Sequence, residues 1–233
     1  MKFPTELIPG QLVKRYKRFF ADVVLDSGET VTAHCANTGA MTGIKEPGLK
    51  VWLSRSDNPK RKLKYTWELV EAEGTIIGAL PNTANALAEE AVKAGVISEL
   101  TGYDSLRREV KYGENSRIDL LLESEGRPAC WVEVKNVHWQ RGIGIAEFPD
   151  GVTSRGAKHL GELSNQVADG HRAVQLFIVQ RNDCHTLRPA EDTDPVYAQA
   201  LRDAARAGVD VLAYACDVST DGIVVTKPMT VEL

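Results

Sequence analysis

The first 80 residues show the pattern of short strands and contain no long helical period. Stretches rich in β-branched and aromatic residues alternate with turn residues such as Asp26-Ser27-Gly28-Glu29. These stretches cover residues 19–25, 30–35, 50–54, 65–73 and 75–79. About five short strands without a helix predict a small β-barrel, and an OB-like barrel is the simplest such form.

Beyond Pro81-Asn82-Thr83 the pattern changes to helices alternating with strands. Asn82 or Thr83 can cap an alanine-rich helix, which Gly95 ends near residue 94. The elements after it are three strands, a helix, a strand, a helix and a strand, at residues 106–111, 117–122, 129–136, 154–169, 174–179, 195–207 and 209–215. Helices packed on a mixed sheet make an α/β sandwich. We therefore expect two domains, residues 1–80 and residues 81–233.

Composition is ordinary for a globular protein, with 26% charged residues. The four cysteines form no C-x-x-C pair, and no apolar stretch is long enough to cross a membrane, so a cytoplasmic protein with reduced thiols is expected. Residues 1–80 hold 12 Lys+Arg and 9 Asp+Glu, whereas the remainder holds 16 and 23. The basic first part favours an anionic partner, and the acidic remainder could supply a divalent-metal site.

The candidate chemistry lies on two neighbouring strands. A hairpin centred on Gly126 would place Asp119 directly opposite Glu133, and Lys135 would share a face with Glu133. Opposed carboxylates repel each other, and a cation such as Mg²⁺ or Mn²⁺ would compensate. Lys135 could then position a water or stabilise a phosphorane-like transition state. The alternative is a solvated strand face, with Asp119 paired to a nearby arginine.

These residues belong to a recognisable pattern. A helix, a three-strand meander carrying Asp and then E-x-K, and a further helix and strand resemble the PD-(D/E)xK nuclease core. The whole chain also resembles the sugar fermentation stimulation protein A family of bacteria and archaea. The segments that carry this resemblance are residues 81–85, 112–119, 131–137, 148–160 and 181–183. The resemblance implies an amino-terminal OB-like domain, a carboxyl-terminal nuclease-like domain, DNA binding and a link to sugar-utilisation genes.

The resemblance to the nuclease core also implies roles for particular residues. The metal would be held by Asp119, Glu133 and the backbone carbonyl of Val134, with Lys135 as the catalytic lysine. A further carboxylate often comes from the first helix, where Glu89 and Glu90 are equal candidates; each could instead be solvated helix surface. Nucleases of this core often pair to cut two strands, so a homodimer is consistent with the resemblance.

The helix after the meander carries a polar stripe separate from its apolar face. Thr153 or Ser154 can cap this helix. The stripe consists of Arg155, His159, Glu162 and Gln166. Arg155 and His159 near the helix start could hold a scissile phosphate. The alternative is an ordinary polar surface with His159 facing solvent.

Two basic clusters in the first domain are interleaved with aromatic residues. They contain Arg15, Lys17 and Arg18, and then Lys60, Arg61, Lys62 and Lys64. Such a surface can track phosphates and stack bases largely without regard to sequence. The alternative is a solvated charge run.

Two functions fit these observations. The first is a DNA endonuclease that depends on Mg²⁺ or Mn²⁺. The second is a DNA-binding regulator of sugar-utilisation genes whose nuclease-like centre is catalytically idle. The intact trio Asp119, Glu133 and Lys135 favours the first, because an idle site has little reason to keep opposed carboxylates.

Overall fold

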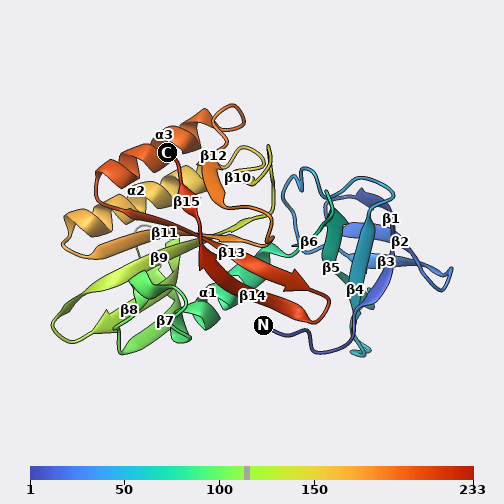
Figure 1. The fold of residues 1–233 in the computed structure, drawn as a ribbon. Helices are drawn as coiled ribbons and strands as arrows, with labels where there is room; N and C mark the ends of the chain where they lie inside the picture. Colours follow the sequence, from blue (N-terminus) through green and yellow to red (C-terminus); the bar gives the residue numbers. More distant parts are fainter. Residues whose placement is uncertain (113–115) are drawn as a thin grey trace.

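The computed structural model describes residues 1–112 and 116–233, so Gly113, Glu114 and Asn115 of the resembling segment 112–119 lie outside the described residues. The chain forms a small β-barrel next to a larger α/β part (Figure 1). No helix in the described ranges is long and apolar enough to cross a membrane.

The barrel is built from six strands of one sheet, in the order β3-β2-β1-β4-β5-β6. A parallel pairing of Ala33 with Tyr65 joins β3 to β5 and closes the sheet on itself. The strands are β1 (Ile8–Tyr16), β2 (Phe20–Leu25), β3 (Thr30–His34), β4 (Lys50–Arg55), β5 (Tyr65–Ala72) and β6 (Thr75–Gly78). The interior is filled by buried side chains such as Leu53 and Trp67. This confirms the predicted OB-like barrel.

Strand β1 was not among the predicted strands. Its sequence contains Pro9 and Gly10, which normally interrupt strands, and its second half is basic. Gly10 is needed here because a Cβ at this position would lie 2.7 Å from the carbonyl oxygen of Val24 on β2. The close approach of the two strands therefore explains why a strand-breaking residue stands inside β1.

The α/β part contains a six-stranded sheet in the order β14-β13-β11-β9-β8-β7. Its strands are β7 (Ser105–Tyr112), β8 (Ser116–Ser124), β9 (Arg127–Val137), β11 (Arg172–Val179), β13 (Asp210–Ser219) and β14 (Gly222–Pro228). The meander β7-β8-β9 is antiparallel, β9, β11 and β13 are parallel, and β14 is antiparallel to β13. This confirms the predicted mixed sheet.

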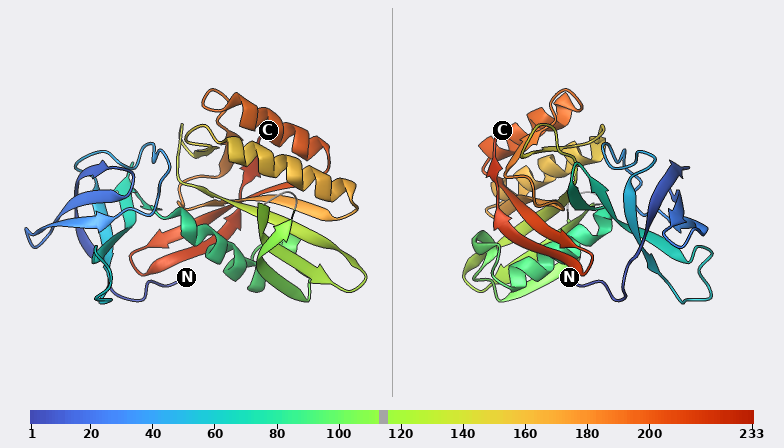
Figure 2. Two further views of the ribbon diagram at one scale, coloured as in Figure 1. Left: turned by 180° about the vertical axis from the view of Figure 1, so that it is seen from behind. Right: turned by 45° about the vertical axis from the view of Figure 1, so that its right-hand side comes forward.

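Helices cover both faces of this sheet (Figure 2). They are α1 (Ala84–Lys93), α2 (Ser154–Ala168) and α3 (Pro195–Arg206), with short 3-10 turns η1 (Pro81–Thr83) and η2 (Ser98–Leu100). Leu87 of α1 packs in a core with Val132 of β9. Leu163 of α2 packs in a second core with Phe177 of β11 on the other face. The candidate site lies where β8, β9 and the start of α2 meet.

In the α/β part, four of the described strands were not predicted. Strands β10 (Ile145–Phe148), β12 (Thr186–Pro189) and β15 (Thr230–Val231) form a small separate sheet, and none has more than four residues. So short a segment carries too little alternation to be recognised. Strand β14 does alternate buried Ile223 and Val225 with exposed Val224, but residues 226–228 are all exposed and include a proline, so the alternation ends halfway.

The barrel is fastened to the α/β part through Gln180 and Arg181, just after β11. The backbone N–H of Gly78 on β6 donates to the carbonyl of Gln180 at 3.0 Å. The guanidinium of Arg181 is only 1% exposed and contacts Glu73 at 3.0 Å and Asp183 at 2.6 Å. The segment 181–183, one of those that carry the family resemblance, is thus a joint between the two parts. The domain boundary near residue 80 remains a prediction.

The first residues of the chain lie against β14, an edge strand of the larger sheet. The amino group of Met1 donates to the carbonyl of Ile223 on β14 at 2.7 Å, and Lys2 bridges to Gly222. The chain then runs back to the barrel, so both ends of the first part contact the α/β part.

Candidate active site

The hairpin β8–β9 has the predicted register over its middle. Leu120 lies opposite Val132, and Leu122 lies opposite Cys130. The described pairing stops there, one residue before Asp119 and Glu133 would meet. On the other side, the pairing of β8 with β7 skips Asp119, where Glu109 has a φ of 54°. At Asp119, strand β8 therefore has no ladder partner among the described residues of either β7 or β9.

The carboxylate of Asp119 takes the place of the missing ladder bonds. It accepts a 2.7 Å hydrogen bond from the backbone N–H of Val134 and a 2.6 Å hydrogen bond from the side-chain amide of Asn85. Burial and then the negative charge of Glu133 raise the pKa of Asp119 to about 6, against the lowering effect of these hydrogen bonds and of Lys135. Asp119 therefore lies in the electrostatic field of Glu133, although the two residues are not among the described pairs of the β8–β9 ladder.

Glu133 is the most deeply buried acid of the site, with 3% exposure. Its Oε1 atom lies 2.6 Å from Nζ of Lys135 and also contacts Nδ1 of His159. Burial raises the pKa of Glu133, but the hydrogen bond from His159 and the charge of Lys135 outweigh it, so the pKa is lowered overall. Among the described residues, its buried Oε2 atom has no hydrogen-bond partner. Glu133 is thus a fixed carboxylate with one oxygen left for a ligand.

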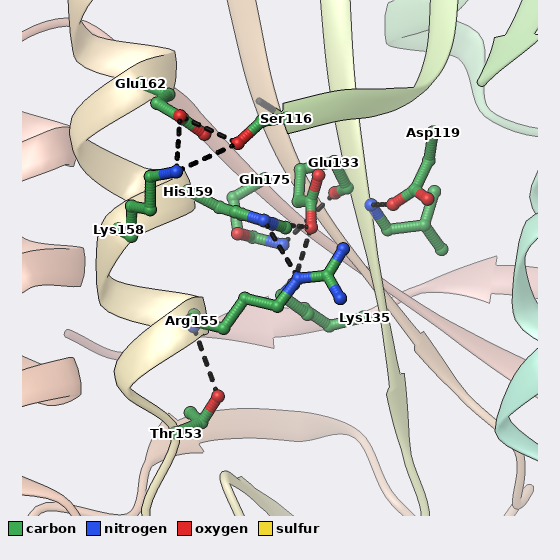
Figure 3. A network of polar contacts seen from close by, with 12 residues as sticks. Ser116, Asp119, Glu133, Lys135, Thr153, Arg155, Lys158, His159, Glu162 and Gln175 are labelled. Atoms are coloured by element: carbon green, nitrogen blue, oxygen red, sulfur yellow. Dashed lines mark hydrogen bonds and ion pairs between the residues drawn. The ribbon is translucent and has the colours of Figure 1, made fainter. Parts of the chain in front are cut away.

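Helix α2 brings the polar stripe to this carboxylate (Figure 3). The side chain of Thr153 caps the helix by accepting from the N–H of Gly156 at 3.2 Å. His159 is only 4% exposed; its Nδ1 contacts Glu133 and its Nε2 lies 3.2 Å from Nε of Arg155. A solvent-facing His159 is therefore ruled out. Since both ring nitrogens are engaged, we assign Nδ1 as the protonated one, donating to Glu133.

The rest of the stripe extends away from Glu133. The side chain of Arg155 is exposed at the helix start, so its remaining N–H groups can reach a ligand. Glu162 is buried and accepts a 2.7 Å hydrogen bond from Ser116 at the start of β8, while Lys158 lies 3.4 Å from the same carboxylate. Gln166 is half-buried a turn further along.

Neither carboxylate proposed from the first helix is brought to Asp119. Glu89 pairs with Lys93 and Arg108, and Glu90 pairs with the amino group of Met1. Within residues 1–112 and 116–233, no three His, Cys, Asp or Glu side chains are grouped so that they could hold a metal alone. Backbone carbonyls, amides or water would have to complete any metal shell.

Two site residues were missed by the sequence analysis. Asn85 lies on the first turn of α1 and contacts Asp119. It is four residues before Glu89, so the two share one face of the helix, and this spacing was the available signal. Gln175 is fully buried on β11 and donates a 3.1 Å hydrogen bond to the carbonyl of Glu133. A glutamine inside the apolar run of residues 174–179 was the available signal.

The basic residues of the barrel divide into two groups. Arg15 and Arg18 donate to carbonyl groups of the loop at residues 37–39, which they hold against the β1–β2 turn. Arg61 donates to Thr66 at 2.8 Å. The exposed lysines of the clusters are Lys17, Lys60, Lys62 and Lys64. Arg15, Arg18 and Arg61 therefore have structural contacts in addition to any role in binding.

Comparison with known proteins agrees with this architecture. Residues 13–79 match the SfsA N-terminal OB domain, and residues 82–222 match the sugar fermentation stimulation protein RE domain. A sugar fermentation stimulation protein homologue of Maricaulis maris is 82% identical over 233 residues, covering 100% of this chain and 99% of that protein. A homologue of Paramagnetospirillum magneticum is 57% identical, covering 100% and 98% of the two chains.

A solved structure shows the same arrangement of both parts. It is Pyrococcus furiosus SfsA in complex with Ca²⁺, with a TM-score of 0.90 and 26% identity, covering 100% of this chain and 98% of that one. With both parts of the chain matched and close relatives aligned from end to end, the chain belongs to the sugar fermentation stimulation protein family.

Proposed function

We propose that this protein is a DNA-binding endonuclease that depends on Mg²⁺ or Mn²⁺, with its centre at Asp119, Glu133 and Lys135. The observation that carries the proposal is the buried carboxylate of Glu133, whose Oε2 atom has no partner among the described residues, beside a second acid whose pKa it raises. Keeping two neighbouring buried acids ionised raises the free energy of the folded state unless a cation binds between them.

The donors fit a hard divalent cation. Asp119, Glu133 and the carbonyl of Val134 would offer oxygen ligands, and Mg²⁺ commonly keeps several waters where the protein offers few ligands. The Pyrococcus furiosus relative was solved in complex with Ca²⁺, another cation that prefers oxygen. Neither Glu89 nor Glu90 is needed for this set.

The chain's own side chains would supply positioning and charge. When bound, the cation would activate water and neutralise charge on the phosphate. Lys135, 16% exposed and held 2.6 Å from Glu133, is placed to orient a water or to stabilise the transition state. Arg155 would hold the phosphate through its exposed guanidinium. His159, buried between Glu133 and Arg155, would fix both of them.

DNA binding is supported by the basic residues on the barrel. Lys17, Lys60, Lys62 and Lys64 are exposed and have the charge to track phosphates. Contacts of this kind read no base edges, so we expect binding that is largely independent of sequence and weakens steeply with salt.

A cleavage assay with a mixed set of DNA substrates tests the proposal. The wild type should cut in Mn²⁺ or Mg²⁺, and Asp119→Asn should not. Calorimetry with Glu133→Gln should show weaker binding of Mn²⁺, and unchanged affinity would remove the proposed metal site. Salt-sensitive DNA binding without any cutting would instead support a catalytically idle DNA-binding regulator.

A further inference from the structure

Two hollows are lined by residues of the barrel, and the second is also lined by residues next to the start of α2. The first, of about 380 Å³, is lined by Phe19, Phe20, His34, Arg61, Lys62 and Leu63. The second, of about 500 Å³, is lined by Arg18 and the loop at residues 38–40 on the barrel and by residues 148–153 before α2. Arg18 and Phe19 are neighbours in the β1–β2 turn, and each lines one of the two hollows. Thr153, in the lining of the second hollow, caps α2 two residues before Arg155 of the candidate active site.

The first hollow combines aromatic faces with cations. Phe19 is 48% exposed and is the one aromatic residue among the exposed large hydrophobic residues that the structure describes. Phe20 stacks on Tyr16 with ring centroids 5.4 Å apart, and Nζ of Lys14 lies 5.2 Å above the Tyr16 ring. Arg61 and Lys62 border the same hollow. This is the composition of a surface that stacks bases and neutralises phosphates.

The second hollow lies between the two parts of the chain. One wall is the barrel loop at residues 38–40, and the other is the segment Phe148–Thr153. The one acid among its lining residues, Asp150, is turned into the wall: its carboxylate lies 3.4 Å from the N–H of Thr42 and 3.4 Å from Nε2 of His138. Arg18 is the one cation among its lining residues, and its Nε and Nη2 atoms both donate to the carbonyl of Thr38 in the same wall.

We infer that these hollows bind one single-stranded segment of DNA, which runs from Phe19 past Arg18 to Arg155 and the candidate active site. A duplex hides its base faces, so an exposed Phe19 would have nothing to stack on. A single strand offers both the bases and the phosphates that this line of residues fits. The inference rests on the proposed function and deepens it, since it makes single-stranded, flapped or forked DNA the substrate class.

Fluorescence anisotropy with a single-stranded 30-mer and a blunt duplex of the same sequence tests the inference in EDTA. The wild type should bind the single strand at least ~10-fold more tightly, and Phe19→Ala should weaken that binding by roughly fivefold or more, the range for loss of one stacked base. Phe19→Tyr should retain the affinity, because it keeps the stacking ring. Val224→Ala, which also changes an exposed apolar side chain but lies on β14, should bind like the wild type.

Equal affinity for the two DNA forms, or Phe19→Ala binding as tightly as the wild type, would overturn the inference. Lys135→Ala separates it from the proposed function, because it should lose cleavage and keep the preference for single strands. Cutting of all substrates without a preference in binding would leave the nuclease standing and refute the single-strand path. A binding preference without any cutting would support the path and refute the nuclease.

Discussion

The side-chain amide of Asn85 lies 2.6 Å from the carboxylate of Asp119, so the first helix brings an amide to the site where a glutamate was expected. This amide stabilises the charged form of Asp119, but burial and the charge of Glu133 act in the opposite direction and dominate. The site without metal therefore holds an acid in an unfavourable field.

Asp119→Asn should stabilise the metal-free protein at neutral pH. The pKa of Asp119 in the folded chain is about 6, above the ordinary value of 3.8, so the folded state favours the protonated form. The contribution of this residue to stability is full below pH 4 and is lost as pH rises through 6. Replacing the charged carboxylate should raise the free energy of unfolding by about 1–3 kcal/mol at pH 8 and change it little at pH 4. Thermal unfolding in EDTA at both pH values measures this, and a loss of stability at pH 8 would contradict it.

Asn85→Asp should make the site more dependent on metal. A third negative charge beside Asp119 would destabilise the metal-free fold and provide a further oxygen ligand. We expect a lower melting temperature in EDTA and a larger rise on adding Mn²⁺ than in the wild type. Asn82→Asp introduces the same charge at an exposed position of η1 and should leave the Mn²⁺ response unchanged. An equal Mn²⁺ response in Asn85→Asp and the wild type would argue against a metal at Asp119.

His159→Ala should lower cleavage without abolishing DNA binding. Removing the ring leaves Glu133 without its histidine contact and Arg155 without the acceptor that orients it. Loss of a residue that orients metal ligands typically costs about 10- to 100-fold in metal affinity or activity. The comparison is single-turnover cleavage at several Mn²⁺ concentrations, with His171→Ala as the control because His171 is exposed. His159→Asn, which retains a donor for Glu133, should recover part of the rate; no difference between the alanine and asparagine variants would remove this role.

Arg181→Ala should weaken the joint between the barrel and the α/β part. It leaves Asp183 and Glu73 without their buried cation and removes a 2.9 Å hydrogen bond to the carbonyl of His138. Glu73 and Asp183 are 56% and 29% exposed, so water can solvate them once the cation is gone, and we expect a loss of about 1–3 kcal/mol from the buried hydrogen bonds. Urea unfolding would measure the loss, with the exposed Arg206→Ala as control. A change below about 1 kcal/mol, the scale of an exposed pair, would show that Arg181 is not a structural link.

The β8–β9 register could be predicted because alternation and one turn determine it. Glu133 and Lys135 alternate with Val132 and Val134, which pack in the apolar core of the opposite face. A shift by one residue would turn both charges into that apolar core. The irregularity between Leu122 and Ser124 lies in the turn and leaves the pairing beyond it unchanged. Local rules were sufficient for this part of the site.

The positions of the helix residues depended on contacts that local rules do not contain. Spacing placed His159 on the polar face of α2, but its burial depends on how closely α2 packs on β9. Glu89 pairs with Lys93 of its own helix and with Arg108 of β7, and only the second of these contacts depends on tertiary packing. Which residue of α1 faces Asp119 was therefore fixed only by tertiary packing.

The most direct test of the central claim is single-turnover cleavage of labelled DNA by the wild type and Lys135→Ala in Mn²⁺ and in EDTA. Lys227→Ala, which changes an exposed lysine on β14, serves as the matched control. We predict cutting by the wild type and Lys227→Ala only when Mn²⁺ is present, and a loss of about 100-fold or more in Lys135→Ala, the scale for one group that stabilises a transition-state charge. Cutting by Lys135→Ala at the wild-type rate would place the chemistry elsewhere and contradict the proposed centre.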